Sequence, residues 1–194
     1  MPSLRSPGQR AGLTRDGVLT AARELLAERG IDGLSMRPLA ERLGVHPNAL
    51  YSHVDSKTAL VDDILDEALA AVETPGPDAA DPIAGVQALM TSSYQVLLAR
   101  ADLIPAYLAR HGARGPHAQH LGNVILALLG RAGVTGPAAR EALHVLIVYT
   151  IGSAAFATRS PLATEGASAA QHHGAHFDHG LRWLLAGIGL DEHD

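Results

Sequence analysis

Apolar residues near the start of the chain recur with the period of an α-helix. Between Thr14 and Arg29 they occupy one helical face, at i, i+3, i+4, i+7 and i+8. These apolar positions are Val18, Ala21, Ala22, Leu25 and Leu26. Thr14 is placed to cap the helix, and Gly30 to end it. The pattern therefore predicts a helix over residues 14–29.

Two shorter helices are predicted directly after the first one. Ser35 is a candidate N-cap for a helix over 35–43, which Gly44 would terminate. A third helix is expected over 46–53, and a fourth over 56–73. The first three helices then have roughly 15, 8 and 7 residues, and a short turn joins the second to the third. This is the layout of a helix-turn-helix unit.

The third helix of such a unit would present a polar and aromatic face without acidic residues. Leu50 points into the core in this geometry, and the remaining residues point outward. The outward residues are His46, Pro47, Asn48, Ala49, Tyr51, Ser52 and His53. A face of this kind can lie in the major groove of DNA.

The proline-rich segment 74–81 marks the clearest break in the chain. Beyond it the pattern predicts five more helices and no strand, so the expected fold class is all-α. Their expected ranges are 82–100, 102–110, 116–132, 137–158 and 173–189. The long connection over 159–170 precedes the last helix.

Composition narrows the class of protein. The 194 residues are 47% apolar and 18% charged, as in a globular protein of one large domain or two small ones. No apolar run approaches the ~20 residues of a bilayer span, so we expect no membrane association. The absence of cysteine removes disulfides and thiolate chemistry and favours the cytoplasm.

Charge is distributed unevenly between the two parts of the chain. Residues 1–60 carry eight Lys or Arg against six Asp or Glu, whereas the remainder carries seven against fourteen. Residues 1–12 are predicted to form a disordered basic arm. A polyanionic partner would therefore meet the N-terminal third.

Residues 13–65 carry a specific family resemblance. The segment LTRDGVLTAARELLAERGIDGLSMRPLAERLGVHPNALYSHVDSKTALVDDIL contains LAxxLGV at 39–45, LYxHV at 50–54 and KxxL at 57–60. It resembles the DNA-binding domain of the tetracycline-repressor (TetR) family of transcriptional regulators. The resemblance implies a helix-turn-helix domain over 13–58 and a helical ligand-binding and dimerisation domain over 59–194.

The resemblance also implies roles for individual residues. Arg37 matches a position that reaches a base edge, where a guanidinium can bind guanine O6 and N7. Tyr51 and Lys57 match positions that hold phosphates, and His53 matches one that packs or touches the DNA backbone. Pro38 departs from the family, because a basic residue is frequent there.

For the C-terminal part, the resemblance implies a homodimer that responds to a small molecule. The residues of 142–157 are apolar on every side, and the last helix has an apolar face, so a pair of such helices from each of two subunits would form a four-helix bundle. That face consists of Phe177, Leu181, Leu184, Leu185 and Ile188. The residues expected to line a pocket for an apolar or amphipathic effector are Met90, Tyr94, Leu97, Ile104, Tyr107, His120, Asn123, Val124, His144 and Tyr149.

The function expected is a cytoplasmic, homodimeric repressor that a small molecule releases from double-stranded operator DNA. It needs no cofactor and is not an enzyme, since the sequence lacks the GxSxG, P-loop and dinucleotide motifs. An activator of the same fold remains an alternative. So does a metal sensor using the histidines between His172 and His179, where i, i+4 and i, i+3 imidazoles share a helical face. A small metal-dependent or histidine-based hydrolase would need a nucleophile–base–orienter set or a three-ligand metal site. A helical protein–protein adaptor would explain the bundle but not Arg37, Tyr51 and Lys57 in motif register.

Overall fold

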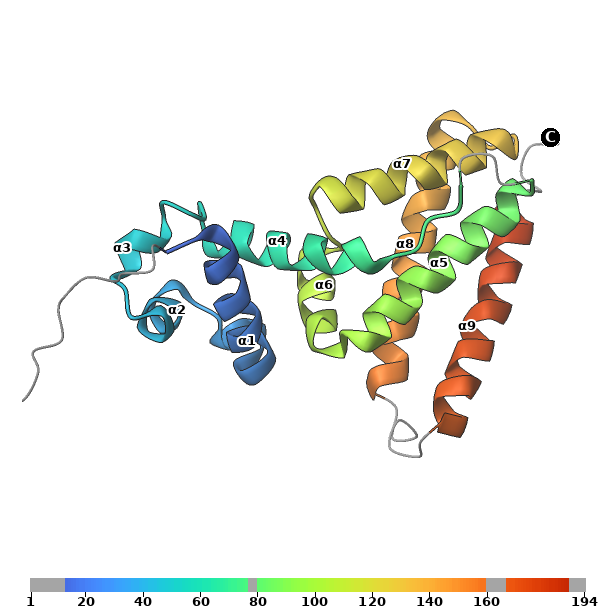
Figure 1. Ribbon diagram of the computed structural model, residues 1–194. Helices are drawn as coiled ribbons and strands as arrows, with labels where there is room; N and C mark the ends of the chain where they lie inside the picture. Colours follow the sequence, from blue (N-terminus) through green and yellow to red (C-terminus); the bar gives the residue numbers. More distant parts are fainter. Residues whose placement is uncertain (1–12, 77–79, 160–166, 189–194) are drawn as a thin grey trace, which may run out of the picture. The chain divides into compact units, whose positions relative to one another are not determined.

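The computed structural model describes residues 13–76, 80–159 and 167–188, with side chains from residue 173 onward in the last range. All regular elements in these ranges are helices, which confirms the all-α expectation (Figure 1). The predicted basic arm, 1–12, lies outside the described residues. The chain divides into two compact units that meet between Leu60 and Val61.

The N-terminal unit contains three helices and the beginning of a fourth. The three are α1 (Arg15–Gly33), α2 (Met36–Leu43) and α3 (Pro47–Leu50). Helix α2 packs against both α1 and α3. The fully buried core combines residues from all three helices, from the connection between α1 and α2 and from the start of α4: Val18, Ala22, Leu34, Leu39, Leu50 and Leu60. This is the packing of a helix-turn-helix unit with α1 as its support.

The helix ends in this unit follow the sequence signals in part. The Thr14 hydroxyl accepts a hydrogen bond from the Gly17 N–H at 3.1 Å, as an N-cap should. Gly44 ends α2 in the left-handed region at φ 65°. Gly30 breaks the regular geometry of α1 at φ 67° but does not end the helix, which continues to Gly33, past the predicted residue 29. Ser35 occupies the N-cap position of α2 but makes no capping hydrogen bond.

The third helix is shorter than its sequence predicts. Regular α-helix covers only Pro47–Leu50, and turns continue to His53. The backbone of the turn still follows the helical path, because the N–H groups of His53 and Val54 both donate to the Leu50 carbonyl. The residues of the predicted 46–53 helix therefore stay in one compact turn.

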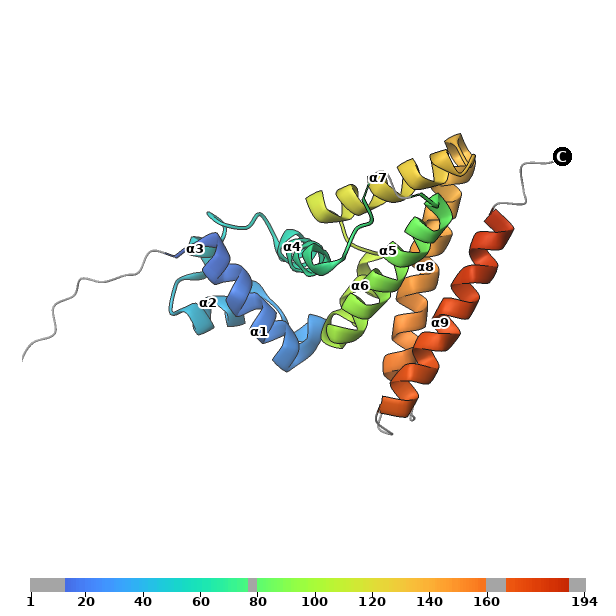
Figure 2. The same ribbon diagram turned by 45° about the vertical axis from the view of Figure 1, so that its right-hand side comes forward.

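Helix α4 (Lys57–Ala68) continues into a 3₁₀ turn, Leu69–Ala71, so it ends earlier than the predicted residue 73. The C-terminal unit then contains α5 to α9 (Figure 2). Their bounds are α5 Pro82–Ala99, α6 Ile104–Arg110, α7 Pro116–Arg131, α8 Gly136–Arg159 and α9 Ala167–Ile188, with a 3₁₀ turn Ala101–Leu103 before α6. Helix α5 packs against α7, α8 and α9. Helix α9 begins before the predicted residue 173, because the Ala-rich segment ahead of it has no helix-breaking residue.

Helix α8 corrects two expectations. It is 24 residues long with an 18-residue window of mean hydropathy 1.4, so by length and composition it is apolar enough to cross a bilayer, contrary to the expectation that no run approaches a span. Within the C-terminal unit it packs against α5, α6, α7 and α9, and 33% of that window is buried. Nor is it buried all round within one chain, since Val145, Val148 and Phe156 are exposed.

Candidate functional site

The exposed face of the helix-turn-helix is formed by α3 and the turn after it. His46, Asn48, Tyr51 and Ser52 are exposed, and Tyr51 presents 53% of its surface to solvent. Pro47, Ala49 and His53 are half-buried beside them. The predicted outward face therefore exists, and no acidic side chain interrupts it between residues 46 and 53.

Two polar side chains of this face are already used to hold its shape. The His46 Nδ1 accepts a hydrogen bond from the Asn48 N–H at 3.3 Å and so caps α3. The Ser52 hydroxyl donates to the Ala49 carbonyl at 2.7 Å. Asn48 and Tyr51 are also exposed on this face.

Arg37 and Lys57 differ in how they are held. Arg37 is exposed in the first turn of α2, and no ion pair to it is present among the described residues. Lys57 is half-buried, and its Nζ donates to the Ile31 carbonyl at 3.0 Å. This hydrogen bond connects the start of α4 to the end of α1.

Helix α2 is fixed to α1 by a surface ion-pair group. The Arg42 guanidinium contacts the carboxylates of Glu28 and Glu24, the latter at 3.5 Å. The hydrogen bond between Arg42 and Glu28 lowers the pKa of Glu28 and raises the pKa of Arg42. These contacts hold the helix that carries Arg37 in a defined orientation on α1.

In the C-terminal unit, the end of α4 is tied to α6 and α7. Arg110 makes two hydrogen bonds of 2.8 Å to the Asp62 carboxylate. The Tyr107 hydroxyl donates to the Leu65 carbonyl at 2.6 Å, and burial raises the pKa of Tyr107. Both contacts join α4 to α6.

A buried carboxylate, that of Asp66 in α4, also binds the N-terminus of α7. The side chain of Asp66 accepts hydrogen bonds from the N–H of His117 at 3.2 Å and of Ala118 at 2.8 Å, and lies 2.9 Å from the His117 Nδ1. The positive end of the helix dipole favours this negative charge. Gly115 makes the approach possible, because a Cβ there would collide with Asp66 and its φ is 151°.

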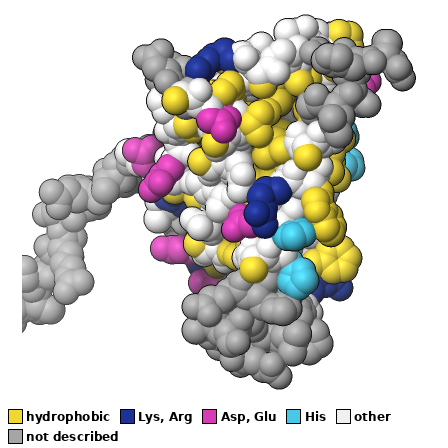
Figure 3. All heavy atoms as spheres, turned by 90° about the vertical axis from the view of Figure 1, so that its right-hand side faces the viewer, with side chains coloured by type: hydrophobic (Ala, Val, Ile, Leu, Met, Phe, Trp, Pro, Cys, Tyr) yellow, Lys and Arg dark blue, Asp and Glu magenta, His cyan; other side chains and the backbone are white. Residues whose placement is uncertain are grey.

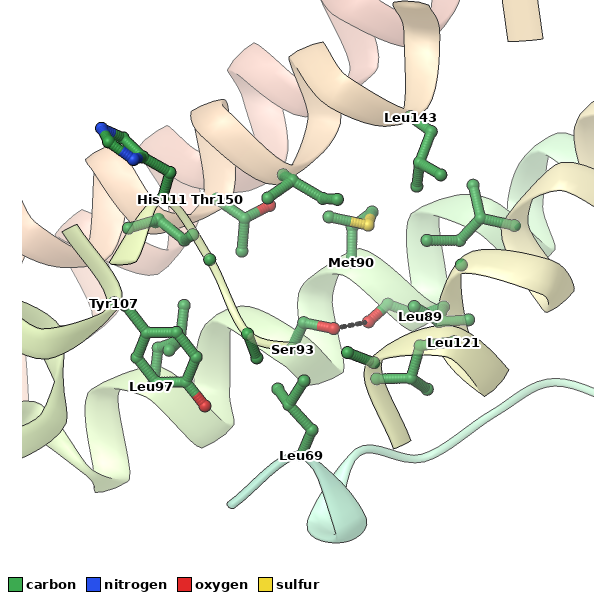
Figure 4. A pocket seen from close by; sticks show the side chains of 17 residues that line it. Leu69, Leu89, Met90, Ser93, Leu97, Tyr107, His111, Leu121, Leu143 and Thr150 are labelled. Atoms are coloured by element: carbon green, nitrogen blue, oxygen red, sulfur yellow. Dashed lines mark hydrogen bonds between the residues drawn. The ribbon is translucent and has the colours of Figure 1, made fainter. Parts of the chain in front are cut away.

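A cavity of about 190 Å³ lies between α5, α6, α7 and α8, within the C-terminal unit (Figure 4). Its walls are mainly aliphatic. The lining residues that sequence reasoning did not select include Leu69, Leu89, Ser93, His111, Leu121, Ile125, Leu143, Ile147, Thr150 and Ile151. A mostly apolar cavity with a few polar groups is typical of a small-molecule site.

Only some of the predicted ligand-binding residues line this cavity. Met90, Leu97 and Tyr107 do. The others lie elsewhere: Ile104 and Tyr94 are buried, Val124 and Tyr149 are half-buried, and His120, Asn123 and His144 are exposed.

Helical periodicity could have found the cavity faces of α7 and α8. On α7 the lining residues Leu121 and Ile125 are spaced i, i+4. On α8 the spacing continues over two turns, from Leu143 through Ile147 to Ile151. The polar residues chosen from the sequence lie on other faces of these helices.

An apolar surface remains uncovered on α8 and α9. Val148 is 55% exposed, Phe156 83% and Trp183 71%. Figure 3 shows broad areas of apolar side chains on the side of the C-terminal unit where α9 lies, between scattered charged groups and histidines. The predicted apolar face of α9 is directed inward, with Phe177, Leu181 and Leu185 buried.

The histidines of α9 do not assemble a metal site among the described side chains. No group of three or more His, Asp or Glu residues with metal-binding geometry occurs there. The side chain of His172 lies outside the described residues. His179 instead packs edge-on against Trp183, with ring centroids 4.6 Å apart.

Together, the folded helix-turn-helix with an exposed polar face and the adjoining helical unit with an apolar cavity define a DNA-binding transcriptional regulator. Residues 18–79 match the family "Bacterial regulatory proteins, tetR family". An HTH-type transcriptional regulator of Saccharopolyspora erythraea is 32% identical over 203 residues, covering 91% of this chain and 84% of that protein. The chain belongs to the TetR family of transcriptional regulators, a family of non-enzymatic proteins.

A tetracycline repressor and a solved structure of another TetR family protein are also similar to this chain. The class D tetracycline repressor protein of Escherichia coli is 52% identical over 60 residues, which cover 31% of this chain and 28% of the repressor. The crystal structure of the Streptomyces coelicolor TetR family protein ActR in complex with (S)-DNPA superposes with a TM-score of 0.71 at 26% identity, covering 91% of this chain and 97% of ActR. The resemblance to the family thus extends over both units.

Proposed function

We propose that the chain is a cytoplasmic, homodimeric repressor that binds operator DNA through α2 and α3 and is released when a small molecule occupies the cavity. The class D tetracycline repressor protein is 52% identical over 60 residues, and ActR was crystallised with a small molecule. The observation that carries the proposal lies within this chain. One helix, α4, begins in the helix-turn-helix unit, and two of its later residues, Asp62 and Asp66, bind the helices that line the cavity.

Release follows from the way α4 is held. The N–H of Ala118 binds Asp66, and the same residue lines the cavity. A ligand that changes the position of α7 or α6 therefore acts directly on α4, which leads into the DNA-binding unit. A ligand shifts an equilibrium only by its different affinity for two states, so the effector must favour an arrangement of the two recognition helices that fits DNA poorly. Operator DNA must then weaken effector binding by the same factor.

The central experiment is selection of binding sites from a pool of random-sequence duplexes with the full chain. We expect a near-palindromic site with half-site centres on the order of 34–36 Å apart or somewhat more, because a two-fold dimer carries one helix-turn-helix per subunit. Transcription in vitro from a promoter that contains this site distinguishes repression from activation. Failure to enrich any duplex would contradict the proposal.

Arg37 and Lys57 are expected to contribute differently to DNA binding. Arg37→Ala should cost ~1–3 kcal/mol on the selected site and relax the preference at one base pair, because the exposed guanidinium reads a base edge. Lys57→Ala should weaken all duplexes alike and reduce the salt slope by about 1. Fluorescence anisotropy on selected and random duplexes at several salt concentrations measures both effects.

The control for this pair is Arg131→Ala, an exposed arginine at the end of α7 in the other unit. It should leave both affinities unchanged. Thermal unfolding of Lys57→Ala separates the loss of the bond to the Ile31 carbonyl from the loss of a phosphate contact. An Arg37→Ala protein that loses as much affinity for random DNA as for selected DNA, or a Lys57→Ala protein with an unchanged salt slope, would refute the assignment.

The dimer is expected to form through the exposed apolar surface of α8 and α9. Val148→Asp should convert the protein to a monomer of 20.2 kDa at micromolar concentration, since a carboxylate would be buried without a partner at the interface. Sedimentation velocity measures the change. Leu108→Asp is the matched control, because Leu108 is also exposed, at 47%, but lies on α6. A dimeric Val148→Asp protein beside a monomeric Leu108→Asp protein would place the interface elsewhere.

A further inference from the structure

The hydroxyl groups of the cavity wall already donate hydrogen bonds to backbone carbonyls of the protein. The Ser93 hydroxyl donates to the Leu89 carbonyl at 2.9 Å, and the Thr150 hydroxyl donates to the Leu146 carbonyl at 2.8 Å. The Tyr107 hydroxyl donates outside the cavity, to the Leu65 carbonyl. For a ligand, Ser93 and Thr150 therefore offer oxygen lone pairs, and the ring of Tyr107 offers apolar surface.

The cavity wall also provides no fixed charge. None of its lining residues is Lys, Arg, Asp or Glu. Among the lining residues, His111 has an exposed imidazole ring at the edge of the cavity. Figure 4 shows this ring directed away from the space between the helices. A carboxylate or ammonium group entering the cavity would lose its hydration without gaining a counter-charge, which strongly disfavours binding.

The size of the cavity limits the ligand as well. An engineered protein cavity of about 150 Å³ binds benzene, and drug-sized ligands occupy pockets of about 300–1,000 Å³. The cavity here, about 190 Å³, fits between these limits. It accepts one ring with a short substituent. Met90 gives the wall some adaptability, because its unbranched side chain can repack around ligands of different shape.

We propose that the effector is an uncharged, compact and largely apolar molecule of about eight to ten non-hydrogen atoms, with at most a hydroxyl or N–H group that donates to Ser93 or Thr150. This inference rests on the proposed function and specifies the ligand class of the same cavity. A charged effector would find no counter-charge on this wall.

The experiment uses the full chain and four probes of similar size: ethylbenzene, benzyl alcohol, benzoate and benzylammonium. Calorimetry and the methyl resonance of Met90 report binding, and anisotropy with the selected duplex reports DNA release. We expect ethylbenzene and benzyl alcohol to bind and to weaken duplex affinity, and the two charged probes to bind at least about 30-fold more weakly. Charged probes that bind as tightly as neutral ones, or neutral probes that do not bind, overturn the inference.

Two sets of variants test whether the neutral probes bind in the cavity. Ala118→Phe fills the space and should abolish binding of both neutral probes, whereas Ala127→Phe, on an exposed position of the same helix, should not. Ser93→Ala combined with Thr150→Val removes the acceptors without adding bulk. It should lower the affinity for benzyl alcohol relative to ethylbenzene by about 3–10-fold. Unchanged probe binding in both Ala118→Phe and the double variant overturns the inference.

The outcomes separate this inference from the proposed function. A probe-free protein that binds no duplex contradicts the proposed function, whatever the probes do. A protein that binds its selected duplex, but whose affinity for that duplex does not change when neutral probes fill the cavity, overturns the effector class and leaves DNA binding intact.

Discussion

Replacing Phe177 with alanine is expected to lower the free energy of unfolding by about 3–5 kcal/mol, the largest effect of any substitution considered. Phe177 is 2% exposed and joins α9 to the rest of its unit. Its ring stacks on Tyr94 of α5 at a centroid distance of 4.1 Å and on Tyr149 of α8 at 5.3 Å. The Tyr149 hydroxyl also donates to the Phe177 carbonyl at 3.0 Å. Removing the ring leaves a cavity between three helices.

Urea denaturation at one fixed protein concentration measures this effect, because dimerisation couples stability to concentration. Leu108→Ala is the control, since it removes an apolar side chain from an exposed position and should change stability by about 1 kcal/mol or less. Phe177→Leu keeps much of the volume and should restore most of the loss. A Phe177→Ala protein as stable as Leu108→Ala would show that the stack does not hold α9 in place.

Replacing Asp66 with alanine is expected to destabilise the protein by about 2–4 kcal/mol. The carboxylate is 5% exposed, and its removal leaves the N–H groups of His117 and Ala118 without their acceptor at the start of α7. It also removes one tie between α4 and the cavity. We therefore expect Asp66→Ala to reduce the fold-change in duplex affinity that an effector produces, together with stability.

The control for Asp66 is Asp102→Ala, which breaks the partly exposed ion pair with Arg100. Pairs of this kind contribute about 0–1 kcal/mol, so Asp102→Ala should have a small effect on unfolding and none on the effector response. Equal destabilisation by both substitutions, or an unaltered effector response in a folded Asp66→Ala protein, would contradict the role assigned to Asp66.

Local sequence signals determined the N-terminal unit almost completely. Thr14, Gly30 and Gly44 act through hydrogen bonds and backbone angles within a few residues, so their effects are visible in the sequence. The same holds for the proline-led starts of α5 and α7. Ser35 and the short α3 differ because several local arrangements compete there, and packing selects one of them.

The ligand cavity depended on information that the sequence does not display. Tyr94 lies one turn after Met90 on α5, so helical geometry places both on similar faces. Met90 lines the cavity, whereas Tyr94 meets Phe177 from a helix more than 80 residues later. Periodicity shows which residues of a helix are buried, but not which helix buries them.

Contacts between distant segments were likewise decided only by the tertiary structure. The sequence by itself determined the family, the order of the helices, the helix-turn-helix and the charge asymmetry, since all of these depend on spacing along the chain. The tertiary structure decided that Lys57 binds the Ile31 carbonyl, that Asp66 holds the start of α7, and that Val148 stays exposed. Such outcomes depend on how whole helices pack against each other. This packing must accommodate the polar and apolar side chains of many residues at once.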